Sequence, residues 1–241
     1  MHTPGQSPSS EATPGASTGE SRLPVRDPLR PSRVVLTGNP NCGKTTLFNA
    51  LTGLRAKVGN YAGVTVERKE GRMKGTPHDL PVTVLDLPGT YSLSPQSIDE
   101  QIARDVLFHR LAEVPAPALV VVVVDASNLE RNLYYTTQVI ELGYPTVVAL
   151  NMVDVAEENG HHIDARALSD ALSVPALPLI ASVGDGLHSL RECILQQLRA
   201  PASGPPAPDL CEMPLPLRAE AKAIAEAIQR SRPHQRPAPR A

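Results

Sequence analysis

Short runs of β-branched and aliphatic residues alternate along the chain with segments whose apolar residues recur at helical spacing. Uninterrupted apolar runs of this length are typical of strands buried on both faces of a sheet. Their alternation with helical patterns predicts an α/β fold, a mostly parallel six-stranded sheet with helices on both faces. We expect strands at 33–37, 82–86, 119–125, 145–150 and 175–180, with one more directly after Thr65, and helices at about 44–53, 98–112, 130–142, 164–173 and 187–199.

Proline separates this core from the two ends of the chain. Of 25 prolines, six lie in residues 1–32 and nine in 201–241, and the other ten are spread through the long stretch between. Residues 1–32, rich in Pro and Ser, lack the apolar side chains that offset ordering entropy, so we predict a disordered extension. We interpret 33–200 as the folded domain, 201–217 as a Pro-rich linker, and 218–241 as a short helix and tail, the remnant of a truncated helical domain.

Composition and charge narrow the classes of function. A net charge of -2 and an aromatic content of 3% offer neither a basic field nor many stacking platforms, so we expect no nucleic-acid partner. The longest apolar run, 116–124, is much shorter than the roughly 20 residues that a membrane span needs. The first residues lack the charged start and apolar stretch of a secretory signal. We therefore expect this chain itself to be soluble.

The first predicted strand runs directly into GNPNCGKT at 38–45, which matches the phosphate-binding pattern GxxxxGK[ST] and leads into a helix. Glycines let backbone N–H groups wrap closely around phosphate oxygens, and the helix N-terminus adds positive potential. Lys44 is expected to reach the β and γ oxygens, and the Thr45 hydroxyl is expected to bind Mg²⁺. The candidate nucleotide-binding residues of this P-loop are Gly38, Asn41, Cys42, Gly43, Lys44, Thr45 and Thr46.

Two later segments have the features of a nucleotide-dependent switch. Asp86 ends an apolar strand, where an acid would meet Mg²⁺ through water, and Gly89 follows at the DxxG spacing that lets a backbone N–H touch the γ-phosphate. Upstream, Thr65 is placed to supply a second Mg²⁺ hydroxyl when a γ-phosphate is present. The remaining candidates in these segments are Gly63 and Val64, and the loops expected to move are 58–67 and 87–98.

The strand at 145–150 runs into Asn151-Met152-Val153-Asp154, which resembles the guanine-reading pattern NKxD. Asp154 can accept hydrogen bonds from guanine N1–H and the 2-amino group, whereas adenine would leave this carboxylate unpaired. Asn151 is expected to tie the base loop to the P-loop, and Met152 to cover the base as an apolar lid. Farther along, Ala181 and Ser182 occupy the place of the loop whose backbone N–H contacts guanine O6. The motifs together predict GTP and GDP as ligands.

The core from about 33 to 200 resembles the N-terminal G domain of the FeoB-type ferrous iron transporters. The resemblance is carried by GNPNCGKTTLFNALTG, VGNYAGVTVERKEG, DLPGTYSL, DEQIARD, VVDASNLERNLY and ALNMVD, and the family's NMxD matches Met152. It implies a GTP-hydrolysing domain at the cytoplasmic face of the bacterial inner membrane. In the family this domain precedes a helical domain and a ferrous-ion permease, which would be its membrane partner. A homo-oligomer would form through the full-length protein.

The usual accelerators of GTP hydrolysis are missing from the motifs. Thr90 follows the DxxG pattern where Ras-type enzymes have a water-orienting glutamine, and no arginine finger is evident. In related potassium-activated GTPases, an asparagine at the place of Asn41 coordinates a monovalent cation. We predict that Asn41 and carbonyls of 58–61 hold K⁺, with Lys44, Thr65 and Gly89 as the other catalytic residues.

Two alternatives stay open at this point. A soluble GTPase of ribosome assembly or tRNA modification shares the P-loop and the base-reading strand but would need an appended RNA-binding domain. A nucleotide-binding regulatory module with negligible turnover is compatible with Thr90 at the glutamine position.

Overall fold

The computed structural model of the chain describes residues 31–200. Strand β1 begins at Ser32, one residue earlier than the sequence pattern indicates. The predictions for the N-terminal extension up to residue 30, the linker at 201–217 and the helix and tail at 218–241 lie outside the described residues.

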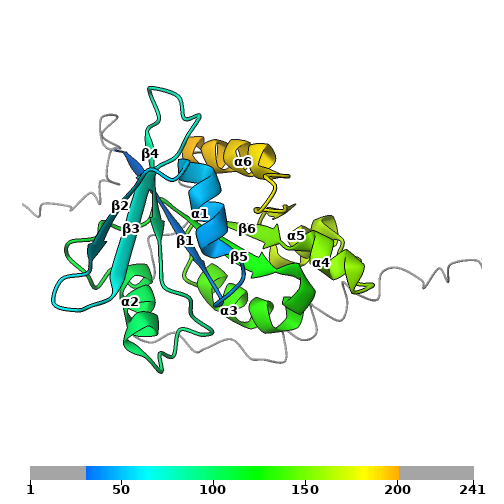
Figure 1. The fold of residues 1–241 in the computed structure, drawn as a ribbon, viewed down its shortest axis with the longest axis horizontal. Helices are drawn as coiled ribbons and strands as arrows, with labels where there is room; N and C mark the ends of the chain where they lie inside the picture. Colours follow the sequence, from blue (N-terminus) through cyan, green and yellow to red (C-terminus); the bar gives the residue numbers. More distant parts are fainter. Residues whose placement is uncertain (1–30, 201–241) are drawn as a thin grey trace, which may run out of the picture.

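A seven-stranded sheet forms the centre of the domain, in the order β2-β3-β4-β1-β5-β6-β7 (Figure 1). The pairs from β4 to β7 are parallel, whereas β2 and β3 run antiparallel to their neighbours. This confirms the mostly parallel fold but corrects the expected strand number from six to seven. The strands are β1 (Ser32–Gly38), β2 (Ala56–Asn60), β3 (Glu67–Arg72), β4 (Val82–Asp86), β5 (Leu119–Asp125), β6 (Thr146–Asn151) and β7 (Ala176–Pro178).

The strand that sequence reasoning missed is β2. Part of it was expected to be a loop, because its residues show no apolar run or alternation. The structure gives the reason: β2 is an edge strand that pairs with β3, and four of its five residues are exposed. An edge strand without a buried face leaves no hydrophobic pattern to detect.

Helices cover both faces of the sheet, and the residues of β5 show how the two cores are divided. Val120, Val122 and Val124 pack with the helices of one face, and Val121 and Val123 with those of the other, as the period of two requires. Helices α1 and α6 lie on one face, and α2, α3 and α5 on the other (Figure 1). The helices are α1 (Lys44–Thr52), α2 (Ile98–Leu107), η1 (Ala126–Asn128), α3 (Leu129–Glu141), α4 (Val153–Glu158), α5 (Ala165–Leu172) and α6 (Leu187–Arg199).

Two element ends and one whole helix differ from the predictions. Helix α2 stops at Leu107 instead of 112 because His109 adopts a φ of 53°, outside the helical region. Strand β7 ends at Pro178, and the chain then turns so that Ile180 pairs with Asp185. Helix α4 was not predicted. Within residues 31–200, no helix has the length and hydropathy required to cross a membrane.

The parallel strands end at one edge of the sheet, where polar residues follow buried apolar ones. Gly38 ends β1, Asp86 ends β4, Asp125 ends β5 and Asn151 ends β6. Ligands of open α/β sheets bind outside the carboxyl ends of the strands. The fold therefore gathers the residues predicted to bind nucleotide at one edge.

Candidate functional site

The P-loop leaves β1 at Gly38 and enters α1 at Lys44, and its backbone requires glycine near the helix start. Gly43 has a φ of 84°, and a Cβ at this position would collide with the side-chain amide of Asn151. Asn41 also lies in the left-handed region, with a φ of 65°, and is exposed. The backbone of Gly43 thus packs closely against Asn151 at the end of β6. A loop that is to hold a phosphate at a helix N-terminus needs such a compact backbone.

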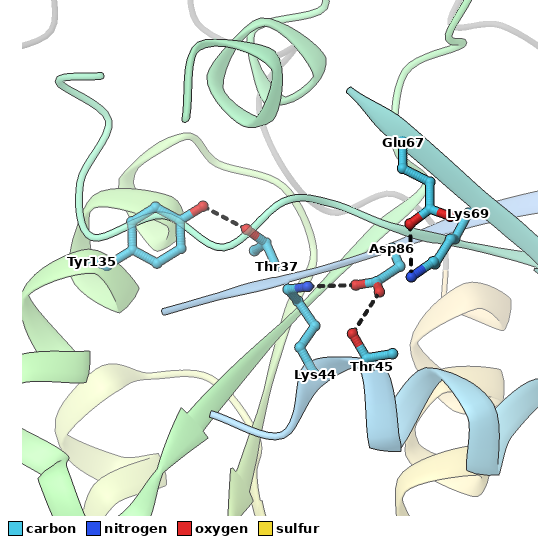
Figure 2. A network of polar contacts seen from close by, with 7 residues as sticks. All are labelled: Thr37, Lys44, Thr45, Glu67, Lys69, Asp86 and Tyr135. Atoms are coloured by element: carbon cyan, nitrogen blue, oxygen red, sulfur yellow. Dashed lines mark hydrogen bonds and ion pairs between the residues drawn. The ribbon is translucent and has the colours of Figure 1, made fainter. Parts of the chain in front are cut away.

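Lys44, Thr45 and Asp86 meet at the start of α1 (Figure 2). The Lys44 ammonium lies 2.7 Å from Asp86 Oδ1, and the Thr45 hydroxyl donates to Asp86 Oδ2 at 3.3 Å. The Asp86 carboxylate is buried, and Lys44 and Thr45 supply the polar partners that a buried carboxylate requires. The arrangement joins the helix start to the end of β4, with a cation, a hydroxyl and a carboxylate within contact distance.

A cavity of about 580 Å³ opens beside this cluster. Several of the predicted residues line this cavity, whereas Thr65 and the 58–61 segment do not. Three lining residues, Asn39, Pro40 and Asp99, were missed by the sequence analysis, because none of them is at a position that the motifs fix. The cavity is lined by Asn39, Pro40, Asn41, Gly43, Lys44, Thr45, Thr46, Gly89, Asp99 and Met152.

Asn151 joins the P-loop to both loops of the predicted base site. Its Nδ2 donates to the Cys42 carbonyl at 2.9 Å, and its Oδ1 accepts from the Ala181 N–H at 3.0 Å. Asn151 is buried, so these bonds replace contacts with water. The next residue, Met152, has a φ of 61° and lines the cavity. Ser182, after Ala181, is exposed.

Asp154 lies in the first turn of α4, a helix that the sequence pattern did not predict. Its Oδ1 atom is buried and has no hydrogen-bond partner within residues 31–200. A buried acceptor without a donor costs about 1–3 kcal/mol, so such an atom is expected where a ligand supplies the donor.

The loop after β4 lies against the P-loop. The Thr90 N–H donates to the Gly38 carbonyl at 3.1 Å, and a Cβ at Gly89 would lie 2.9 Å from the Pro40 Cα. The Thr90 side chain is fully buried, and its hydroxyl donates to the Ser92 carbonyl. Thr90 is therefore turned away from the cavity and is not placed to orient water there.

The structure does not bring Thr65 to the cavity. Thr65 is exposed, on a loop that Tyr61 and Val66 close with a backbone hydrogen bond of 3.0 Å. Gly63, with a φ of 77°, and the half-buried Val64 lie in the same loop. The hairpin of β2 and β3 occupies residues 56–60 and 67–72, so the predicted mobile loop 58–67 is shortened to the residues between these strands.

Cys42 fills a closed position beneath the P-loop. Burial raises the pKa of its thiol to about 11, although nearby Lys44 acts in the opposite direction. The thiol is therefore protonated at neutral pH, which fits a small packing residue rather than a reactive nucleophile.

Helix α3 supports the site from one face of the sheet. The Asn39 side-chain amide donates to the Arg131 carbonyl at 3.3 Å, and the hydroxyls of Thr37 and Tyr135 lie 2.6 Å apart in the core (Figure 2). These pairs are separated by more than 90 residues, so no local pattern could have revealed them.

A family model for ferrous iron transport protein B matches residues 32–194. The chain belongs to this family. It is 55% identical over 163 residues to the Fe(2+) transporter FeoB of Salmonella typhimurium, covering 66% of this chain and 20% of that relative. It is 54% identical, with the same coverage, to the Fe(2+) transporter FeoB of Escherichia coli K12. The chain thus spans about a fifth of the length of these curated relatives.

Solved structures of FeoB cytosolic domains are also similar to this chain. That of L. pneumophila FeoB is 43% identical, with a TM-score of 0.64, over 69% of this chain and 63% of that one. That of T. maritima FeoB in a GDP form is 40% identical, with a TM-score of 0.65, over 72% and 65%. The GMPPNP form of the T. maritima domain is 40% identical, with a TM-score of 0.64, over 70% of this chain and 64% of that one. These likenesses confirm the P-loop GTPase fold of the FeoB G domain.

Proposed function

We propose that this chain binds GTP in the cavity at the P-loop and hydrolyses it slowly, as the switch domain of a ferrous iron transporter. Family membership supports a GTP-binding domain, and the T. maritima relative was solved in GDP and GMPPNP forms. The observation that carries the base assignment is the buried Oδ1 of Asp154, which follows the end of β6 and has no hydrogen-bond partner among the described residues.

Guanine would supply hydrogen-bond donors to the Asp154 carboxylate. Its N1–H and 2-amino groups would both face the carboxylate, whereas adenine presents no donor there and would leave the acid desolvated and unpaired. Met152 would cover the base, and the Ala181 segment would approach O6, because Asn151 holds both loops against the P-loop. Discrimination between GTP and ATP would then be worth several kcal/mol.

The triphosphate would lie along the P-loop, with Lys44 facing the β and γ oxygens. Thr45 and Asp86 fit a Mg²⁺ site, because hydroxyl and carboxylate oxygens are the ligands that this cation prefers. When bound, Mg²⁺ would neutralise negative charge on the phosphate oxygens. Lys44 would exchange its contact with Asp86 for contacts with phosphate, and Gly89 would offer its N–H to the γ-phosphate.

Hydrolysis would need a source of positive charge other than an arginine finger. Asn41 is exposed, lines the cavity, and has an amide oxygen suited to a monovalent cation. When bound there, K⁺ would offset charge developing between the β and γ phosphates. Carbonyls of 58–61 would complete this site only after β2 gives up part of its pairing with β3. Thr65 would join the Mg²⁺ site in the same closure.

The partner of this domain would be the ferrous-ion permease. The match covers only 20% of the length of the Salmonella typhimurium Fe(2+) transporter FeoB, which leaves room for such a part. In that setting the domain would lie at the cytoplasmic face of the bacterial inner membrane and couple its nucleotide state to ferrous iron uptake. Oligomerisation would occur through the full-length protein. The family match supports this function over an RNA-associated GTPase.

Competition binding with GTP, ATP and xanthosine triphosphate tests the base assignment. Wild type should prefer GTP to ATP by about 100-fold or more. Asp154→Asn turns one acceptor into a donor and should shift the preference toward xanthosine triphosphate. Glu158→Gln removes the same charge from an exposed position of the same helix and should leave the preference unchanged. Equal affinity of wild type for ATP and GTP would refute the assignment.

A further inference from the structure

The loop that carries Gly89 is held by hydrogen bonds to β1, to Glu100 of α2 and to α3. At its start, Leu87 N–H donates to the Leu36 carbonyl at 3.0 Å and Thr90 N–H to the Gly38 carbonyl at 3.1 Å. These bonds attach the first half of the loop to β1 and the P-loop. The second half, from residue 91 to the start of α2, leaves this support and runs beside α3.

A buried side chain of α3 holds this second half. The Leu93 N–H donates to Gln138 Oε1 at 2.7 Å, and Gln138 is only 1% exposed. The Leu93 side chain is buried in the core on the same face of the sheet. The other amide atom of Gln138, Nε2, has no hydrogen-bond partner in the described part of the chain. The polar function of this glutamine is therefore directed at the loop.

Apart from the buried Leu93, this part of the loop is largely exposed. A cavity of about 980 Å³ lies between it and the start of α3, lined in part by Tyr91, Ser92 and Ser94 from the loop. Arg131 of α3 lies over the exposed Tyr91 ring at 4.2 Å, a contact at the surface. Because the loop borders open space, the short buried bond to Gln138 is its main polar restraint from α3.

We propose that Gln138 is a positioning residue for GTP hydrolysis, an inference that rests on the proposed function. By fixing Leu93, Gln138 limits the movement of the loop away from the position in which Thr90 attaches it to Gly38, and so helps to set where the Gly89 N–H stands relative to the γ-phosphate. The same helix holds the P-loop through Asn39 and the Arg131 carbonyl. Helix α3 therefore determines the spacing between the two loops that approach the phosphates, and Gln138 is its contact with the moving one.

Three variants test the role of Gln138. Gln138→Leu removes the acceptor at similar volume. Gln138→Glu keeps an oxygen at the position of Oε1, and it removes no hydrogen bond seen within residues 31–200, because Nε2 has no partner there. Thr136→Val is the control: it removes another buried hydrogen bond of α3, from the Thr136 hydroxyl to the Asn132 carbonyl at 2.8 Å, which does not touch the loop.

The measurements are single-turnover hydrolysis in K⁺, the dissociation constants of GDP and GMPPNP, and the thermal midpoint. Gln138→Leu should lower the hydrolysis rate and the GMPPNP-to-GDP preference about tenfold, because GDP does not need the Gly89 N–H. Gln138→Glu should restore both. Thr136→Val should lower the midpoint comparably while both functional readouts stay at the wild-type level.

The outcomes separate this inference from the function on which it rests. If wild type fails to bind GDP and GMPPNP, the proposed function is lost. If wild type binds both, and Gln138→Leu lowers only the thermal midpoint as Thr136→Val does, then Gln138 is structural and the inference is overturned. Failure of Gln138→Glu to recover the rate would also overturn it, since the acceptor would then not be the functional atom.

Discussion

The Asn151 side chain is the point where a single substitution should separate the P-loop from the base loops. Asn151→Ala removes a donor to the Cys42 carbonyl at 2.9 Å and an acceptor for the Ala181 N–H at 3.0 Å. Cys42 and Ala181 are 1% and 5% exposed, so water does not readily replace the lost partners. Leaving each buried group unpaired costs about 1–3 kcal/mol, which gives about 2–6 kcal/mol for the pair.

Urea denaturation in the absence of nucleotide measures this loss as a fall in the free energy of unfolding. Asn159→Ala is the matched control, because Asn159 is exposed and is the C-cap residue that follows α4. This substitution should change the free energy of unfolding by no more than about 0.5 kcal/mol. GDP affinity should also fall in Asn151→Ala, since both loops that would hold the nucleotide lose their shared partner. A variant as stable as wild type would refute the reasoning.

Two further predictions concern the P-loop. Hydrolysis should be faster in K⁺ than in Na⁺ at matched ionic strength, and Asn41→Ala should erase the difference while nucleotide affinity stays nearly intact; equal single-turnover rates of wild type in the two salts would count against the cation site. Because burial raises the pKa of Cys42 from 9.0 to about 11, the unfolded chain loses this proton first as the pH rises. The free energy of unfolding should therefore decline from about pH 9 to about pH 11. In urea titrations Cys42→Ser should show a shallower decline than wild type, because Tyr61 and Tyr135, whose pKa values burial also raises, still contribute to it.

Much of the fold was predictable because its strands are continuous apolar runs. The sequence of β5, LVVVVVD, is buried over six residues and could be recognised without knowledge of its neighbours. By contrast, β2 has the sequence AKVGN and four exposed residues, so its strand conformation comes from pairing with β3. Helix α4 follows a left-handed Met152, a conformation that sequence patterns do not signal in a non-glycine residue.

The site divides in the same way. The P-loop directly follows β1, and Asp86 and Asn151 are the last residues of β4 and β6. Recognising the ends of the strands was therefore enough to bring these residues together. Asn39, Asp99 and Gln138 contribute through contacts across the fold. One signal was available for Gln138: it interrupts the buried, otherwise largely apolar face of α3, where a polar side chain requires a partner. The sequence did not indicate which loop would supply that partner.

Because β2 lies at the edge of the sheet, it is less stably held than the central strands. Among the strands of residues 31–200, β2 pairs with β3 alone, so five residues can unpair while the parallel pairs of β1 with β4 and β5 stay intact. Opening of this kind is sub-global and draws on a small part of the free energy of unfolding. The segment that we propose to move toward a bound phosphate can thus open at little cost to the core that holds the P-loop.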